Sequence, residues 1–236
     1  YKTSGGLDTV AIRMPSNVIA RAIIKEAGIP IAAPSANISG RPSPTKAKHV
    51  YEEMNGRVDG IVLGGDSNFG LESTVLDLTE ETPMILRPGS ITKEVLEELL
   101  GEVKLDPSLS KKEDNQKAKA PGMKYKHYSP NADVYIISGK RENVATKIND
   151  MIKSNRDKGL KTGVMCISRN REFYDGEVID LGNSLEEVAS NLFDALIEMD
   201  KKGVDVIYSE EFPKTGVGQA IMNRLLKSAG YKVIKA

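Results

Sequence analysis

The sequence predicts an α/β protein in which a polar segment joins two blocks. Three observations support this prediction. Short β-rich runs alternate with amphipathic helical patterns in the first hundred or so residues. The segment 106–119 holds only Leu109 and Ala118 as apolar residues, so it buries too little surface to offset the entropy of ordering. After this segment strands and helices alternate regularly, which favours a small parallel sheet.

The first block, residues 1–101, predicts a mixed arrangement of short strands and helices. Helices are expected to open at Ser16, at Ser43 with Pro44 in the first helical position, and at Thr92. The expected strands are residues 9–14, 29–33, 59–63, 73–78 and 84–86. The block has too few helices for a simple doubly wound order, so another α/β arrangement is indicated.

The region 132–236 follows a linker at 102–131 and predicts a Rossmann-like parallel α/β domain. Strands are expected at 134–137, 162–167, 178–181 and 204–208, and helices at 141–158 and 217–229. A further helix opens at a capping box of Ser184 and Glu187. Its apolar stripe consists of Leu185, Val188, Leu192, Leu196 and Met199.

The composition excludes several classes of protein. The chain holds 33 basic and 33 acidic residues, whereas a general nucleic-acid binder usually has a strong basic excess. No apolar run approaches the roughly 20 residues that cross a bilayer. Cys166 is the only cysteine, so it cannot form an internal disulfide, and its apolar surroundings predict a buried thiol. With no signal-peptide pattern visible, these features predict a reducing, cytoplasmic setting.

The loop 33–45 gathers side chains suited to ligand binding. Small, hydroxyl and amide residues follow a predicted strand and precede a predicted helix, where α/β sheets bind ligands. The free N–H groups of a helix N-terminus favour an anion such as phosphate. A structural reading fits equally well, with Ser43 as an N-cap and Asn37 as a turn residue.

Two arginines, Arg13 and Arg87, end or follow predicted strands. An arginine in an apolar strand is costly unless it meets an anion. A carboxylate or phosphate ligand matches its bidentate fork, but an internal Asp or Glu is the commoner partner. Ser73 begins another predicted strand and is a weak signal by itself.

Several motifs stand in one order along the chain. They lie at 5–15, 28–30, 35–37, 71–75 and 86–89, then at 120–130 and 216–225. The Ser35-Ala36-Asn37 signature and its neighbours resemble the YrdC-like family. The two later motifs are similar to the joining segment and second domain of its two-domain threonylcarbamoyl-AMP synthases. The resemblance covers essentially the whole chain and implies that the first block is the C-terminal part of a twisted mixed sheet.

This resemblance implies an enzyme, a nucleotidyltransferase that makes L-threonylcarbamoyladenylate and pyrophosphate from L-threonine, bicarbonate or CO2, and ATP. The product is expected to pass to the machinery that forms threonylcarbamoyladenosine in tRNA. A carbamate oxygen attacks the α-phosphorus in such a reaction, and the protein aligns the reactants and neutralises charge. Mg²⁺ is expected to bridge the phosphates.

The resemblance also implies contacts for single residues, none of them a catalytic group or a metal ligand. ATP is expected to contact Thr9, Ser35, Asn37, Ser43, Arg87 and Tyr128. L-Threonine is expected to contact Arg13, Ser73 and the backbone of Ala33. His127 is expected to dock over the nucleotide with Tyr128, and His49 to be a solvated or packing residue.

The sequence departs from the family in one respect and leaves one alternative open. The family's Lys-x-Arg element is not in these residues, and the first residue is Tyr1, so the chain is expected to be incomplete and inactive alone. An RNA- or tRNA-binding module of the same fold is the alternative, which the zero net charge disfavours. A hydrogenase-maturation carbamoyltransferase is excluded because one cysteine cannot make its zinc motifs.

Overall fold

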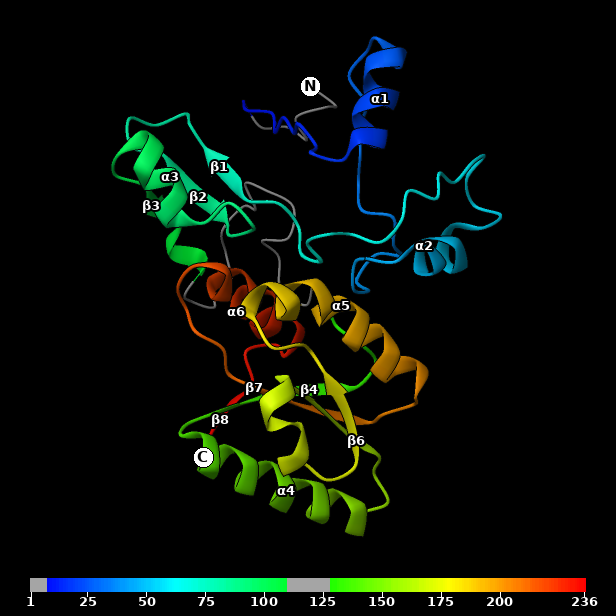
Figure 1. The fold of residues 1–236 in the computed structure, drawn as a ribbon, viewed down its shortest axis with the longest axis vertical. Coiled ribbons are helices and arrows are strands. Elements are labelled where there is room, and N and C mark those ends of the chain that lie inside the picture. The colour runs from blue at the N-terminus through cyan, green and yellow to red at the C-terminus, as the bar shows by residue number, and fades with distance from the viewer. Residues whose placement is uncertain (1–7, 110–127) are drawn as a thin grey trace.

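The computed structural model describes residues 8–109 and 128–236. Figure 1 shows two parts stacked along the long axis of the molecule. The lower part contains a five-stranded sheet with helices on both faces, and the upper part contains a three-stranded sheet and separate helices. The α/β class predicted from the sequence is confirmed. Within the described residues, every helix is too short or too polar to cross a membrane.

The larger sheet is parallel throughout. Its strands are β4 (Asp133–Ser138), β5 (Thr162–Cys166), β6 (Glu177–Asp180), β7 (Val206–Glu210) and β8 (Val233–Lys235). They stand in the order β6-β5-β7-β4-β8, and every pair is parallel. The predicted Rossmann-like arrangement is therefore confirmed, and β8 is an edge strand that the sequence patterns did not predict.

Helices cover both faces of this sheet (Figure 1). α4 (Arg141–Asp157) and the short 3-10 helix η2 (Ser168–Phe173) lie on one face. α5 (Leu185–Lys201) and α6 (Val217–Ser228) lie on the other. An apolar core fills each side of the sheet, as a doubly covered parallel sheet requires.

α5 begins at the predicted capping box. The Ser184 hydroxyl accepts a hydrogen bond from the Glu187 amide at 3.2 Å. The Glu187 carboxylate accepts from the amide of Asn183 at 2.6 Å, one residue earlier than in the usual box. The predicted apolar stripe follows and is buried, except for a partly exposed Leu185. The helix therefore has both the start and the buried face that its sequence indicates.

The smaller sheet is mixed, as the family resemblance implies. β1 (Val75–Asp77) pairs antiparallel with β2 (Met84–Arg87). β2 pairs parallel with β3 (Lys104–Leu105). The strands predicted at 73–78 and 84–86 are therefore confirmed in their centres, whereas β3 was not predicted.

α3 (Lys93–Leu100) follows β2 and begins where the sequence predicts. The Thr92 hydroxyl accepts from the amide of Val95 at 3.5 Å. The 3-10 helix η1 (Pro107–Leu109) and β3 stand at the start of the range 102–131. Residues 110–127 of that range lie outside the described residues.

Three predicted strands of the first block are wrong. None of the residues at 9–14, 29–33 or 59–63 belongs to a strand. Most of their apolar side chains are exposed instead, Ile12 by 91% and Met14 by 85%. A strand forms only with a hydrogen-bonded neighbour, and no described segment pairs with these three. Local alternation of residues cannot supply that neighbour.

α1 (Val18–Ala27) begins slightly later than predicted. Asn17, not Ser16, is the cap, since its side-chain oxygen accepts from the amides of Ile19 and Ala20 at 3.0 Å each. The helix ends at Gly28 with a φ of 63°, the left-handed conformation that glycine adopts without strain.

α2 (Ala47–Met54) also begins later than predicted. Its N-cap is Lys46, whose side chain makes no capping bond, so Ser43 does not cap this helix. The Ser43 hydroxyl donates to Oε1 of Glu72 at 3.3 Å instead. Ser43 therefore contacts a carboxylate 29 positions away and does not cap the helix.

The upper part rests on α5 and α6. Gly70 lies so close to the backbone of Ala189 and Ser190 on α5 that a Cβ would collide with it. Leu71, the next residue, is 6% exposed and belongs to the core beneath these helices. Only glycine permits such a close approach of two backbones, so Gly70 sets how the chain crosses α5.

Candidate functional site

A buried ion pair joins the two parts of the molecule. The side chain of Arg224 on α6 is fully buried, and its Nε donates to Oε2 of Glu72 at 2.9 Å. Its two terminal nitrogens donate to the carbonyl oxygens of Pro88 at 2.7 Å and of Glu72 at 3.1 Å. A buried guanidinium requires such partners because an unpaired buried charge is strongly destabilising. α6 therefore fixes Glu72 next to the turn that follows β2.

Arg87 ends β2 beside this pair. It is 4% exposed, and its Nε donates to the carbonyl oxygen of Ser73 at 3.1 Å. Gly89 lies against the backbone of Ser73 and Thr74 so closely that a Cβ would collide. Burial lowers the pKa of the Arg87 guanidinium, and repulsion by Arg224 lowers it further. Positive charge is therefore concentrated at this point.

Tyr128 and Lys227 lie in the same buried region. Tyr128 is 3% exposed, and its ring stacks on Phe193 with centroids 5.0 Å apart. Burial and the Glu72 carboxylate raise the pKa of Tyr128, so the phenol keeps its proton. Lys227 on α6 is 4% exposed, and burial with repulsion by Arg224 lowers its pKa to about 8.

Arg87, Arg224, Lys227 and Glu72 together form what we call the cationic cluster. Burial alone would raise the pKa of Glu72, but the attraction and hydrogen bond of Arg224 hold it below its ordinary value of 4.5. At neutral pH the cluster therefore holds one carboxylate and an excess of positive charge. This excess of positive charge attracts anions, such as a phosphate or a carboxylate, to the vicinity of the cluster.

Comparisons with known proteins place the chain in a family. The family model described as threonylcarbamoyl-AMP synthase, C-terminal domain, matches residues 91–230, and one described as telomere recombination matches 2–89. Threonylcarbamoyl-AMP synthases of Pyrococcus abyssi and Bacillus subtilis are 48% and 46% identical over 98% and 99% of the chain. The crystal structure of P. abyssi Sua5 complexed with L-threonine matches with a TM-score of 0.91 at 48% identity, over 99% of this chain and 67% of that one.

The chain belongs to the threonylcarbamoyl-AMP synthase family. The family predicted from the motifs is confirmed, and with it an enzyme of the nucleotidyltransferase type. The chain spans about two thirds of the length of the first two relatives, since each alignment covers 67% of the relative.

Three of the residues that the synthase resemblance assigns to ATP lie at the cationic cluster. Arg87 belongs to it, Tyr128 borders it, and the Ser43 hydroxyl contacts its carboxylate. Arg13, assigned to threonine, lies near enough to lower the pKa of Arg87 slightly by repulsion. Ser73, also assigned to threonine, gives its carbonyl oxygen to Arg87 while its side chain is exposed.

The remaining assigned residues lie in exposed loop segments. Thr9, Ala33 and Ser35 are exposed. The Asn37 amide donates to the carbonyl oxygens of Ile38 at 3.0 Å and Arg41 at 3.2 Å, which is the turn role left open by the sequence. Oδ1 of Asn37 is buried and accepts no hydrogen bond, so a turn role and a ligand contact are compatible. The ligand contacts of all nine residues remain predictions.

A small hollow lies at the start of α2, near the predicted anion site. It is lined by residues 44–47 and 61–65 with Val50 and Ser67, and by none of the nine assigned residues. Lys46, which lies at its rim, donates to Oδ2 of Asp194 at 2.6 Å. His127, expected beside Tyr128, lies outside the described residues.

Sequence reasoning missed three members of the cationic cluster. Glu72 and Arg224 stand in two of the quoted motifs, but they are 152 positions apart and nothing local shows that they meet. Lys227 resembles any polar residue of an amphipathic helix. The available signal was two basic residues three positions apart in a helix whose neighbours are mostly apolar.

Proposed function

We propose that the protein forms L-threonylcarbamoyladenylate and pyrophosphate from L-threonine, bicarbonate or CO2, and ATP. The observation that carries the proposal is the buried cationic cluster in a chain of this family. The triphosphate and the threonine carboxylate are anions of the kind that such a cluster neutralises. A relative, P. abyssi Sua5, has a crystal structure with L-threonine, which supports threonine as the amino-acid substrate.

The proposed contacts follow the residues assigned above. ATP contacts Thr9, Ser35, Asn37, Ser43, Arg87 and Tyr128, and L-threonine contacts Arg13, Ser73 and the backbone of Ala33. These side chains position the reactants and balance charge, and none acts as a covalent nucleophile. Mg²⁺ enters with the nucleotide substrate, bound to its phosphates.

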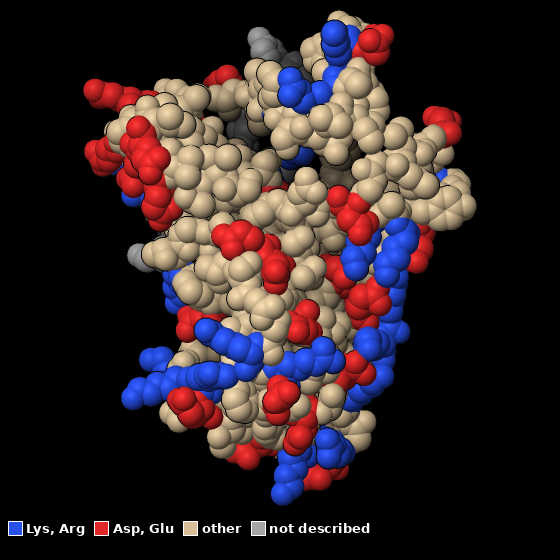
Figure 2. Space-filling view, viewed as in Figure 1, with Lys and Arg blue, Asp and Glu red and all other residues tan. Residues whose placement is uncertain are grey.

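The proposal extends to the organisation of the chain and the fate of its product. Residues 1–101 form the synthase part, 102–131 the linker that carries the 126–130 segment, and 132–236 the second domain. The adenylate passes in the cytoplasm to a separate tRNA-modifying transferase. Figure 2 shows basic and acidic side chains interspersed over the lower part of one face. A mixed surface of this kind gives no strong field of one sign, so this face does not favour the RNA-binding alternative.

The activity test is adenylate formation by the protein as its gene encodes it. Pyrophosphate release and mass spectrometry of the nucleotide product are followed with ATP, L-threonine and bicarbonate. Formation of the adduct should require all three substrates. Pyrophosphate release that continues without threonine, or release with no threonylcarbamoyl adduct, contradicts the proposal.

A substitution separates the two substrate sites. Arg13→Ala should raise the KM for L-threonine roughly tenfold or more, since a charge-assisted contact contributes about 1.5–3 kcal/mol. The KM for ATP should change little. Arg21→Ala, which removes an exposed arginine of α1, is the matched control and should change neither. Equal weakening of both substrates by Arg13→Ala would refute its assignment to threonine.

A further inference from the structure

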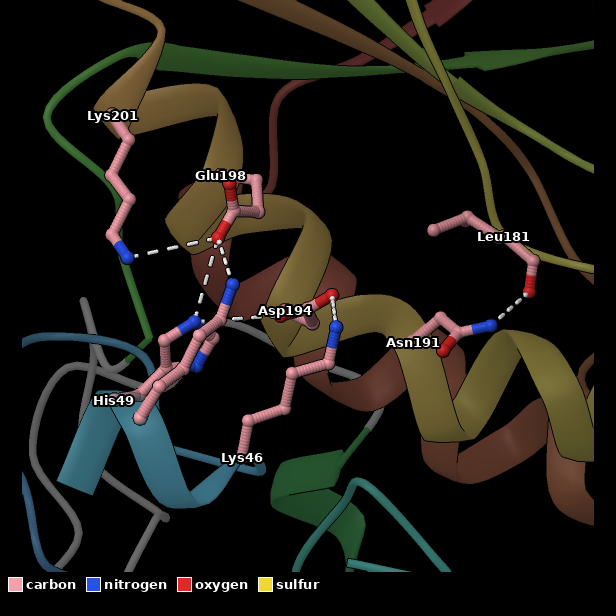
Figure 3. Close-up of polar contacts among 8 residues, drawn as sticks. Lys46, His49, Leu181, Asn191, Asp194, Glu198 and Lys201 are labelled. Carbon is pink, nitrogen blue, oxygen red and sulfur yellow. Dashed lines mark hydrogen bonds and ion pairs between the residues drawn. The ribbon is translucent and has the colours of Figure 1, made fainter. Parts of the chain in front are cut away.

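A second polar group lies where α2 meets α5, away from the cationic cluster. His49 on α2 is 2% exposed, and its Nε2 lies 3.5 Å from Oδ1 of Asp194 and 3.5 Å from Oε1 of Glu198. Figure 3 shows the imidazole directed at both carboxylates. Asp194 and Glu198 are one helical turn apart on α5, so they present their oxygens on one face.

Several polar atoms of this group are buried without a hydrogen bond. They are Nδ1 and Nε2 of His49 and Oδ1 of Asp194. Native proteins rarely leave buried polar atoms without a partner, and a bound ion or water commonly satisfies such atoms. His49 is therefore buried, as expected of a packing residue, but its Nδ1 makes no hydrogen bond and its Nε2 approaches the two carboxylates only to 3.5 Å.

The spacing of the three side chains fits a small divalent ion. Their ligand atoms all lie within 4.8 Å of one another. Metal–ligand bonds of about 2.0–2.2 Å place tetrahedral ligand atoms roughly 3.3–3.6 Å apart, which matches both distances from Nε2 of His49. One imidazole with two carboxylates suits Zn²⁺ and similar transition ions better than Mg²⁺ or Ca²⁺, which prefer oxygen ligands alone.

Lysines surround the carboxylates, leaving Oδ1 of Asp194 available but contacting Oε1 of Glu198. Lys46 bonds to Oδ2 of Asp194 at 2.6 Å and leaves Oδ1 for another partner. Lys48 and Lys201 reach Oε1 of Glu198 at 3.1 and 3.7 Å. Their side chains are 53% and 40% exposed, so both can turn to solvent when an ion arrives.

We propose that His49, Asp194 and Glu198 bind one divalent transition-metal ion of the Zn²⁺ class that holds α2 on α5. Water completes the coordination. The ion is structural, because the site is apart from the nine residues assigned to ATP and threonine. It fixes the helix that follows the loop 33–45 to the second domain, and it does not depend on the proposed activity.

Metal binding to the purified protein tests the proposal. The protein is stripped with a chelator, exchanged into metal-free buffer, and titrated with Zn²⁺ by calorimetry and with Co²⁺ by visible absorption. We expect one equivalent to bind, with the absorption of four-coordinate Co²⁺, and the melting temperature to rise with Zn²⁺ concentration. Removal of a ligand by His49→Ala or Glu198→Gln should weaken binding roughly tenfold or more and abolish the rise.

Two control variants test whether any loss of metal binding is specific to the proposed ligands. His127→Ala removes the chain's other histidine, and Glu186→Gln removes an exposed carboxylate of α5, and both should bind like the parent. Far-UV circular dichroism checks that each variant folds. Equal affinity in the parent and the ligand variants would overturn the proposal. So would stabilisation by acid alone with no response to Zn²⁺, which would mark His49 as a protonated ion-pair partner.

Discussion

Residues 8–70 and residues 132–236 differ in how their elements are completed. In residues 132–236, each strand has at least one parallel neighbour, and helices bury both faces of the sheet. In residues 8–70, segments with strand-like sequences have no paired neighbour, and apolar side chains such as Ile12 are exposed. A strand-like pattern therefore indicates only that a segment can pair with a neighbour, whereas a capped helix is largely determined by its own residues.

The largest effect is expected where the upper and lower parts of the molecule are joined. Arg224→Met leaves the largely buried Glu72 carboxylate without its main partner, so it should lower the free energy of unfolding by about 3–5 kcal/mol. Lys202→Ala removes a largely exposed pair with Glu177 and should cost only about 0–1 kcal/mol. Urea unfolding of both variants measures the difference. Similar losses for the two variants would show that the Arg224–Glu72 pair does not join the upper and lower parts of the molecule.

A matched pair of isoleucines compares the two regions directly. Ile136 in β4 is 0% exposed and Ile12 is 91% exposed. Ile136→Ala should lower the free energy of unfolding by about 2–5 kcal/mol because it opens a cavity in a close-packed core. Ile12→Ala should change it by at most about 0.5 kcal/mol. A large loss from Ile12→Ala in denaturant unfolding would contradict the exposure of that segment.

The pH dependence of stability should report the burial of Lys227. The folded group has a pKa of about 8, while the unfolded group titrates near its ordinary value of 10.5. Between these values the unfolded chain binds more protons, so stability contributed by this group should rise as the pH increases from about 8. Lys227→Met should flatten that rise relative to the parent in urea unfolding at several pH values. An unchanged slope would place Lys227 in solvent.

The sequence predicted the elements that depend on their own residues better than those that depend on a distant partner. Gly28, Thr92 and Ser184 act through atoms within a few residues, and all three end or begin helices as predicted. Strands β4 to β7 were predicted because their runs of apolar residues alternate with well-marked helices. β8 was missed because its three residues are too few to show an alternating pattern, and only its pairing with β4 makes it a strand.

The site was predicted only in part, for a related reason. The motifs identify Arg87, Ser43 and Tyr128, which the structure brings to one buried region. Glu72 and Arg224 could not be paired from a single sequence, because a contact across 152 positions leaves no local pattern. The prediction that Ser43 caps a helix was wrong for the same reason, since its hydroxyl contacts Glu72 instead.

The smallest effect is expected at helix caps. Ser184→Ala removes the cap of α5, a helix with seven buried residues, and should lower the free energy of global unfolding by about 0.5–2 kcal/mol. Asn17→Ala removes the cap of α1, which has no buried residue, and should loosen that helix without a measurable change in global unfolding. Equal global losses would show that α1 unfolds together with the domain.

Amide hydrogen exchange with and without ATP and L-threonine tests most directly whether the ligands bind the upper part of the molecule beside the cationic cluster. Both ligands together should slow exchange at 33–43, 72–75 and 87–89, where the assigned residues lie. Exchange in β5 and β7 should not change, since these strands already lie in the closed sheet. Ligand protection confined to 132–236, with none in the three segments, would show that the ligands do not bind the upper part beside the cationic cluster.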